Sequence, residues 1–545
     1  MTTTDEGRPT ARPRSPWAPL RHRVFLALFV AQLASNIGTL MQNVGSAWLM
    51  GDLGASASLV ALVQTATFLP VLLVGVPAGA LADIVDRRRL IIVTQAWMMA
   101  SALALAVLAF ADVITPALLL GLTFALGVGT ALNGPAWLAI QPDLVPREDM
   151  GQAIALGSMT YNVGRAVGPA VGGLVVATAG PAWVFLLNGA SFVGILLVLL
   201  RWRSPEGMSR GTEESLAAAT RAALRYGANA PRLRGILIRT SAFVLPAAGL
   251  QALLPTVVRE DLGMGSGRYG LLLGSFGLGA VCTVVLRPRL EARFSFDTLH
   301  VGATAVVAGA LVVQGVVPVF WVLAVALFLG GCSWTTANTT TNISVQRTLP
   351  SWVRARGLGA YLVAITGGMS IGSAVWGAVA DWSLQGAHLL AAGCSIAGMA
   401  AVRRWPLSRA VAPDLSTVPG DEPDVVLQPN GADGPVLVTV VYVVPVGDVD
   451  AFLAAMRPVE GHRRRTGAYR WELFRDLAAP DRFVEAFHVQ SWAEHLRQHQ
   501  RLTASADANI AVVRRFTRAP PSITHLISAY GTGDIAPAPI QHPAE

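Results

Sequence analysis

Residues 160–174 read TYNVGRAVGPAVGGL and place an arginine, a proline and four glycines inside an otherwise apolar stretch. Tyr161 and Asn162 lie four and three residues before Arg165, so a helix puts all three on one face. A guanidinium inside a membrane span is costly and nearly always faces the bundle interior or a water-filled cavity. The segment therefore predicts a positive charge in a cavity, where it could meet an anionic substrate or serve proton coupling.

The glycines of this segment follow a helical period. Gly164, Gly168 and Gly172 recur every four residues and form one stripe, which lets a second membrane helix approach until the backbones touch. Pro169 has no N–H to donate to the carbonyl four residues earlier, so the helix is expected to bend there. The segment thus predicts a close-packed, bent helix with its polar face beside the glycine stripe.

Other uncharged polar side chains fall near the middle of apolar runs. Each alone is typical of a hydrogen bond between membrane helices. Together with Arg165 they indicate a weakly polar cavity that suits an amphipathic or anionic organic molecule. The candidate cavity residues are Asn36, Gln42, Asn43, Gln64, Asn133, Tyr161, Asn162, Arg165, Gln251, Asn338 and Asn342.

Proton coupling requires a carboxylate that titrates within the transport pathway. The acidic residues of the apolar region stand at the ends of spans rather than in mid-span, at Asp52, Asp83, Asp143, Glu260, Asp261 and Asp381. The residues themselves therefore give proton coupling little support.

The elements that must position these residues are membrane helices. Of the 545 residues, 53% are hydrophobic and 14% are charged, which is typical of a chain that crosses a membrane many times. Apolar runs long enough to span occur only before about residue 403. They predict helices at 24–50, 57–82, 90–111, 117–140, 151–178, 182–200, 236–258, 269–286, 299–319, 320–345, 357–380 and 386–402.

Arginines orient these spans, because loops on the cytoplasmic side carry an excess of basic residues. The N-terminal tail, the second loop and the long loop 201–235 are arginine-rich, whereas the odd-numbered loops hold little basic charge. Both termini are therefore predicted to be cytoplasmic. The long loop divides the spans into two sets of six. A glycine pattern also recurs at one constant offset: Gly164, Gly168 and Gly173 reappear as Gly368, Gly372 and Gly377. This indicates two parallel repeats.

The remainder of the chain predicts a second domain. A linker rich in proline, glycine and acidic residues precedes segments in the order strand, helix, strand, strand, helix, strand, which is typical of an α+β ferredoxin-like domain. Its first strand is apolar on both faces, so a second copy of the domain would serve to cover one of them. Trp492, His495 and His499 form a possible site there, although His495 and His499 lack an obvious third ligand for a metal.

The second loop, GALADIVDRRRL at 79–90, resembles the signature loop of the major facilitator superfamily. The resemblance implies a twelve-helix major facilitator fold. It also implies a conformational latch between the two halves that holds the outward-facing state, with a partner near 354–357. Asp86 stands where the family usually has glycine. The latch residues are Gly79, Leu81, Asp83, Arg87, Arg88 and Arg89.

The fifth span resembles the antiporter motif of drug–proton exporters in the same superfamily through Gly164, Gly168, Pro169, Gly172 and Gly173. The resemblance implies export driven by protons. Span four departs from those exporters, because it lacks their arginine. The combination of the motifs with a soluble tail resembles the enterobactin-exporter-like subgroup, and the tail resembles domains related to antibiotic-biosynthesis monooxygenases.

The sequence therefore predicts a multi-pass exporter of a drug, siderophore or other natural product in the bacterial inner membrane. Its partners would be the substrate, protons, the lipid bilayer and possible second copies of the tail, with no cofactor, metal or nucleic acid. An enzymatic tail and an uptake transporter are the alternatives. The predicted parts are an N-terminal tail (1–23), a first half (24–200), an inter-half loop (201–235), a second half (236–403), a linker (404–434), the ferredoxin-like domain (435–532) and a disordered end (533–545).

Overall fold

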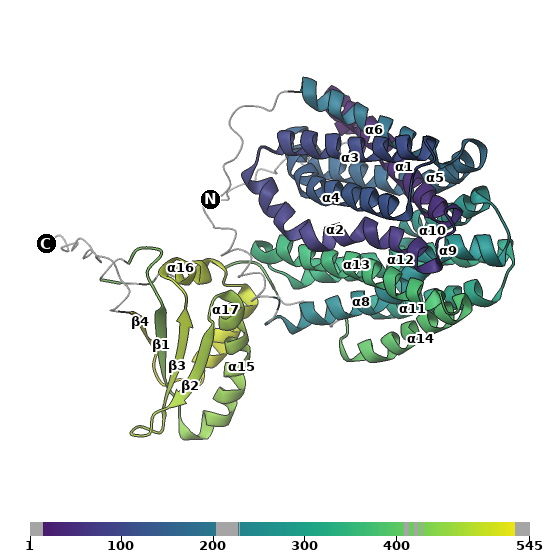
Figure 1. Cartoon of the computed structure of the whole chain (residues 1–545). Coiled ribbons are helices and arrows are strands. Elements are labelled where there is room, and N and C mark those ends of the chain that lie inside the picture. Colours follow the sequence, from purple (N-terminus) through teal and green to yellow (C-terminus); the bar gives the residue numbers. More distant parts are fainter. Residues whose placement is uncertain are drawn as a thin grey trace, which may run out of the picture. The chain divides into compact units, whose positions relative to one another are not determined.

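The computed structural model describes residues 15–202, 227, 229–407, 414–418, 423, 425, 426 and 429–528. The chain divides into two compact units (Figure 1). The first comprises Met1–Thr212, Arg239–Thr341 and Leu362–Arg404, and the second comprises Glu213–Ile238, Asn342–Tyr361 and Trp405–Glu545. The predicted C-terminal end, 533–545, lies outside the described residues, as do most of the N-terminal tail and of the inter-half loop.

Long helices make up the part of the chain before residue 405, and each predicted span coincides with one of them. They are α1 (Arg23–Asp52), α2 (Ala57–Ile84), α3 (Arg87–Phe110), α4 (Pro116–Ile140), α5 (Met150–Ala179), α6 (Pro181–Arg201), α8 (Pro231–Ala252), α10 (Ser266–Arg293), α11 (Phe296–Val316), α12 (Phe320–Thr348), α13 (Ser351–Ala380) and α14 (Leu384–Ala401).

Eleven helices among the described residues are long and apolar enough to cross a membrane. The exception among the predicted spans is α5, whose glycines, amides and arginine lower its hydropathy although it is 30 residues long. Successive helices run in opposite directions, so the turns after α1, α5 and α13 lie at one end of the bundle. We call this end the odd-loop end and the opposite one the even-loop end.

The seventh span is a broken helix. The prediction at 236–258 falls within one candidate membrane helix, Pro231–Asp261, which is irregular: α8 ends at Ala252, and the short α9 (Leu254–Thr256) continues into a π-helix, η4 (Val257–Asp261). Pro255 cannot donate to the carbonyl of Gln251, which disfavours a regular helix there. Gln314 of α11 donates to the Leu250 carbonyl at 3.2 Å and so satisfies one backbone group near the break.

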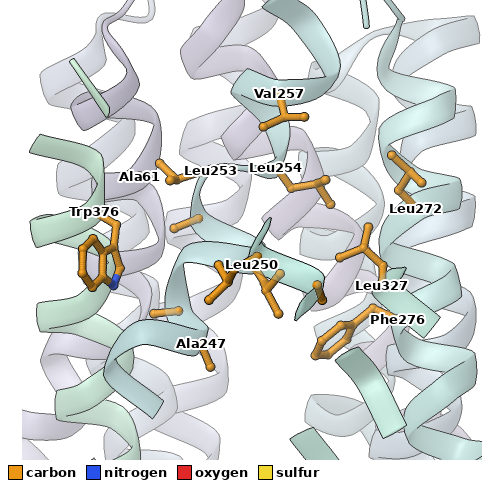
Figure 2. Packing of buried hydrophobic residues seen from close by; sticks show 14 of the residues in the cluster. Ala61, Ala247, Leu250, Leu253, Leu254, Val257, Leu272, Phe276, Leu327 and Trp376 are labelled. Atoms are coloured by element: carbon orange, nitrogen blue, oxygen red, sulfur yellow. The ribbon is translucent and has the colours of Figure 1, made fainter. Parts of the chain in front are cut away.

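The break lies within the largest buried apolar cluster. Leu250, Leu253 and Leu254 are buried, and they pack with Phe276 of α10 and Trp376 of α13 (Figure 2). Two further residues of the cluster, Met41 and Val44, come from α1. The core therefore joins helices of both predicted halves around the broken span.

The segment after the linker forms a four-stranded antiparallel sheet with helices. The elements are β1 (Val436–Val443), α15 (Val449–Thr466), β2 (Arg470–Arg475), β3 (Arg482–Val489), α16 (Trp492–Gln500), α17 (Ala504–Arg514) and β4 (Ser522–Ile527). The strand order is β2-β3-β1-β4. Alternate residues of β1 are buried, and they pack with Phe452, Met456 and Val459 of α15. The elements follow the predicted order, except that the second helix is divided into α16 and α17.

Candidate functional site

The glycine stripe of α5 lies against the backbone of α1. A Cβ at Gly168 would come within 2.8 Å of Leu40 Cβ and 3.1 Å of the Ile37 carbonyl oxygen. At Gly172 it would come within 2.8 Å of Met41 Cα. Contacts below 3.0 Å do not occur for real side chains, so only glycine allows α1 and α5 to pack this closely.

The neighbouring face of α5 contacts α10 in the same way. A Cβ at Gly173 would lie 2.6 Å from the Ser266 carbonyl oxygen and 2.7 Å from Gly270 Cα. Farther along the pair, a Cβ at Gly277 of α10 would overlap the carbonyl oxygen of Arg165. The helix α5 thus joins a helix of the first half to a helix of the second half through backbone contacts.

The repeated glycines of α13 have matching surroundings. Gly368 meets Val244 of α8, and Gly372 meets the Leu245 carbonyl and Ala248. Gly377 meets Ala61 and Ser58 of α2. The fifth span therefore packs on the first and eighth, and the eleventh on the seventh and second, as two parallel repeats require.

Arg165 lies at the α5–α10 contact. Its guanidinium carbon is 5.6 Å from the centroid of the buried Phe276 ring, and the side chain is half-buried. Within the described residues no carboxylate forms an ion pair with it. Tyr161, on the same helix, is 52% exposed, whereas Asn162 donates to the Ser158 carbonyl of its own helix. The arrangement leaves a cation that an anionic group could meet.

Three of the predicted cavity residues take part in hydrogen bonds between helices of the first half. Gln42 accepts from the buried Asn188 of α6, and Asn36 donates to Thr160 of α5 at 3.0 Å. Asn133 of α4 accepts from Thr94 of α3 at 3.2 Å and from Gln95 at 3.4 Å. Their partners were not among the predicted residues, because an amide's partner on a distant span leaves no local pattern.

The remaining predicted cavity residues are more varied. Gln64 of α2 accepts from Ser373 of α13 at 3.0 Å and so bridges the two halves. Asn338 donates to the Trp334 carbonyl of its own helix. Asn342 belongs to the second unit and accepts from Gln346. Asn43 and Gln251 are half-buried.

The arginines of the second loop hold other helix ends of the first half. Arg87 donates to the Ala139 carbonyl at the end of α4, and Arg88 donates to the Leu199 carbonyl at the end of α6 at 2.7 Å. Asp86, which replaces the usual glycine, accepts from the Arg89 N–H at 2.7 Å and caps α3.

The other latch residues give a partial picture. Gly79 is half-buried and nothing lies within 4 Å of its added Cβ, and Leu81 is 37% exposed. The side chain of Asp83 is not among those described, and the partner segment 354–357 belongs to the second unit. The latch therefore stays a prediction.

A buried charged group of the membrane helices was missed by the sequence analysis. Arg239 of α8 is 2% exposed and donates to Asp297 of α11 at 2.5 Å. His300, one turn further along α11, is also 2% exposed. The signal was present, because Arg239 falls inside the apolar run 236–258.

The predicted tail site gathers aromatic rings. The His495 ring lies 5.0 Å from the His499 ring and 4.9 Å from that of His525, with Trp492 at 5.3 Å. Burial lowers the pKa of His495 to about 3 and also lowers the pKa of His525, so both rings are neutral near pH 7. Across the described residues, no three His, Cys, Asp or Glu side chains are arranged to hold a metal ion.

A buried carboxylate organises a second cluster of side chains in the tail domain. Glu485 of β3 is fully buried and accepts from Tyr442 at 2.8 Å, Trp471 at 2.9 Å and Arg463 at 3.1 Å. Residues 480–490 gave no sign of this network, because its donors come from two other strands and from α15.

Residues 14–532 match the family described as transmembrane secretion effector, a group of major facilitator transporters. The chain belongs to this family. The expectation of a major facilitator transporter is thereby confirmed, and the match reaches past the sheet of the tail.

Curated relatives of this transporter include siderophore carriers. It is 26% identical over 358 residues to the enterobactin exporter EntS of Citrobacter koseri, covering 65% of this chain and 85% of that one. It is 27% identical to the staphyloferrin A transporter of Staphylococcus aureus over 166 residues, which cover 30% of this chain and only 42% of the relative.

Solved structures share the fold. A bacterial homologue of the iron transporter ferroportin matches with a TM-score of 0.56 and 15% identity, covering 71% of this chain and 99% of that one. A bacterial homologue of the human lysosomal transporter Spinster matches with a TM-score of 0.56 and 14% identity, covering 72% and 98%. At these identities the likeness establishes the fold alone.

Proposed function

We propose that this transporter exports an organic small molecule of the siderophore type across the bacterial inner membrane, with both of its termini in the cytoplasm. The observation that carries the proposal is the placement of α5. Its glycines contact α1 and α10 through backbone atoms, and Arg165 lies at the same contact beside Phe276. A helix pair whose closest contacts join backbone atoms can slide or rock while a substrate beside it is passed on.

The cationic side chain suits the substrate class. Siderophores are named in the relatives' descriptions, and the relative with the broadest coverage is an exporter. Arg165 would attract an anionic substrate group, and Gln64, Tyr161 and Asn43 would supply neutral hydrogen-bonding groups. We infer that the two halves rock about this region, as in other transporters built from repeats.

Proton antiport is part of the proposal. The fifth-span motif supports it, and the missing mid-span carboxylate leaves its path to be found by mutation. If export is driven by protons, adding substrate to inside-out vesicles should reduce the acidification of their lumen or should dissipate an imposed proton gradient faster. An exporter driven otherwise would leave the gradient unchanged.

Expression in a host that lacks its own siderophore and drug exporters tests the proposed function. The host would carry the wild-type chain, Arg165→Ala or Asp83→Asn, and would be scored for resistance to and secretion of a compound panel. We expect wild type to secrete at least one anionic compound and both variants to lose it. Equal secretion by all three would contradict the site, and no secretion or net uptake would contradict the function.

We propose that the tail is a ferredoxin-like module, related to antibiotic-biosynthesis monooxygenases, that pairs with a second copy. The sheet face opposite α15 presents Leu437 beside Leu526 and Val441 beside Val484, and Phe474 follows on the next strand. Leu526 is 48% exposed and Phe474 is 50% exposed. Covering such a face stabilises by roughly 25 cal/mol per Å² of apolar area.

The mass in solution of a fragment spanning residues 429–545 tests this pairing. A dimer that Leu526→Arg converts to a monomer would support it, and a monomeric wild-type fragment would exclude it. The same fragment can be assayed for oxidation of phenolic substrates. Turnover that is lost in His495→Ala would favour the enzymatic alternative over a purely structural tail.

A further inference from the structure

The odd-loop end holds a contact between the halves that involves none of the predicted latch or cavity residues. Asp381, the residue after α13, accepts a hydrogen bond from the backbone N–H of Ser58 in the first turn of α2 at 2.9 Å. The N-cap residue of α2, Ser56, makes no capping bond with its own side chain. A carboxylate of the second half therefore caps a helix of the first half.

A second charged contact lies at the same end. Asp52, the last residue of α1, forms an ion pair with Arg259 of η4. The guanidinium carbon of Arg259 lies 5.2 Å from the centroid of the Trp48 ring, and Trp48 stacks on Tyr269 of α10 at 6.0 Å. Both charged side chains are more than one-third exposed, so solvent reaches the pair from outside the bundle.

The contact between α2 and α13 continues inward from Asp381. Gly377 packs against Ala61, Ser373 donates to Gln64 at 3.0 Å, and Thr65 donates to the Ser370 carbonyl at 3.0 Å. These are single hydrogen bonds and one close backbone approach. Such an interface can separate and form again.

The two pairs of helices that join the halves differ in chemistry. Between α5 and α10 the closest contacts are those of glycine and backbone atoms, around Gly173, Gly270 and Gly277. Between α2 and α13 the contact includes a carboxylate at a helix N-terminus. The first pair of helices is suited to sliding without breaking a specific bond. The second pair is suited to holding one conformation until its hydrogen bond breaks.

We propose that Asp381 is a latch that closes the odd-loop end, the counterpart of the latch that Asp83 is predicted to provide at the even-loop end. Asp381 lies beside the N-terminus of α2, and α2 itself carries a carboxylate, Asp83, in its own last turn. Rocking of the halves engages one carboxylate and releases the other, so the pair defines two states. The Asp52–Arg259 ion pair reinforces the closed odd-loop end. The inference rests on the proposed transport function.

Labelling of a buried reporter tests the latch in membranes. Ser373 is fully buried between α13 and α2, and cysteine is close to it in size. Ser373→Cys is placed in a chain in which Cys282, Cys332 and Cys394 are serine, and its reaction with a membrane-impermeant maleimide is timed in right-side-out and inside-out vesicles. Asp381→Ala is compared with Asp261→Ala, an exposed carboxylate at the same end.

We expect Asp381→Ala to raise the labelling rate from the odd-loop side by about three- to tenfold, the range expected for one lost helix cap. Asp261→Ala should leave the rate unchanged. An unchanged rate in Asp381→Ala, an equal rise in both variants, or a rise only from the even-loop side would overturn the proposal.

Amide hydrogen exchange supplies a measurement that needs no cysteine changes. In the otherwise wild-type chain, peptides covering residues 53–66 should exchange faster in Asp381→Ala than in Asp261→Ala. Equal exchange would again overturn the latch. Neither measurement requires a transported compound, so a failed latch is distinguishable from a failed export function, which the compound panel tests separately.

Discussion

Replacing Gly173 by alanine should block the close approach of α5 and α10. The added Cβ would lie 2.6 Å from the Ser266 carbonyl oxygen, 2.7 Å from Gly270 Cα and 3.0 Å from Gly270 N. All three are backbone atoms, so no side chain can turn away. An ordinary contact begins at 3.4 Å, so α10 must move by about 0.7 Å or more. Overpacking of this kind costs about 1–3 kcal/mol.

This cost destabilises the state in which α5 and α10 touch, and it lowers the population of that state by about five- to 150-fold. Export should fall in proportion if each cycle passes through it. Gly151→Ala is the matched control, because Gly151 lies on the same helix and nothing lies within 4 Å of its added Cβ. Initial rates would be measured in vesicles at equal amounts of inserted protein. Equal export rates for the two variants would refute the role of the glycines as a sliding contact between α5 and α10.

Three further predictions concern charge. Arg165→Ala should reduce the initial rate of export of anionic compounds at least about tenfold, and Arg165→Lys should reduce it less, with the export rate of neutral compounds as the reference. Equal losses for anionic and neutral compounds would contradict a role in substrate attraction. Glu485→Ala should destabilise a fragment spanning residues 429–532 by about 3–5 kcal/mol in denaturant unfolding, because one buried and two half-buried donors lose their acceptor. A loss below about 1 kcal/mol would show that the network matters little. Burial lowers the pKa of His462 and of His495 to about 3, so the unfolded state binds protons below about pH 6.5 that the folded state does not. Stability should therefore fall as the pH falls from about 6.5 toward 3, by up to about 1.4 kcal/mol per pH unit for each histidine. A double replacement by glutamine should flatten the slope, and an unchanged slope would place the titrating groups elsewhere.

Features that depend on local sequence were predictable. The spans follow from runs of apolar residues, and the stripe of Gly164, Gly168 and Gly172 shows in the sequence as a period of four. The division of the last helix was also readable, because Thr503 accepts from the Ala506 N–H and starts α17 as a threonine N-cap. That signal was missed, because the stretch was predicted as a single helix.

Features that depend on packing between distant residues were not predictable. Asp381 and Ser58 are 323 residues apart, and nothing near either one marks it as a partner of the other. The break in α8 was signalled by Pro255. Whether the fold tolerates this break, however, depends on Gln314, which donates to the Leu250 carbonyl 64 residues away in the sequence. In each case the residue types were visible in the sequence and only the fold brought them together.

Transport of a siderophore into inside-out membrane vesicles tests the central claim most directly. The vesicles would hold the wild-type chain or Gly173→Ala, with an imposed proton gradient, acidic inside. The account predicts substrate accumulation in wild-type vesicles, loss of accumulation when the gradient is collapsed, and a much lower rate in Gly173→Ala. Failure of the wild-type chain to accumulate any siderophore, or accumulation only in right-side-out vesicles, would contradict it.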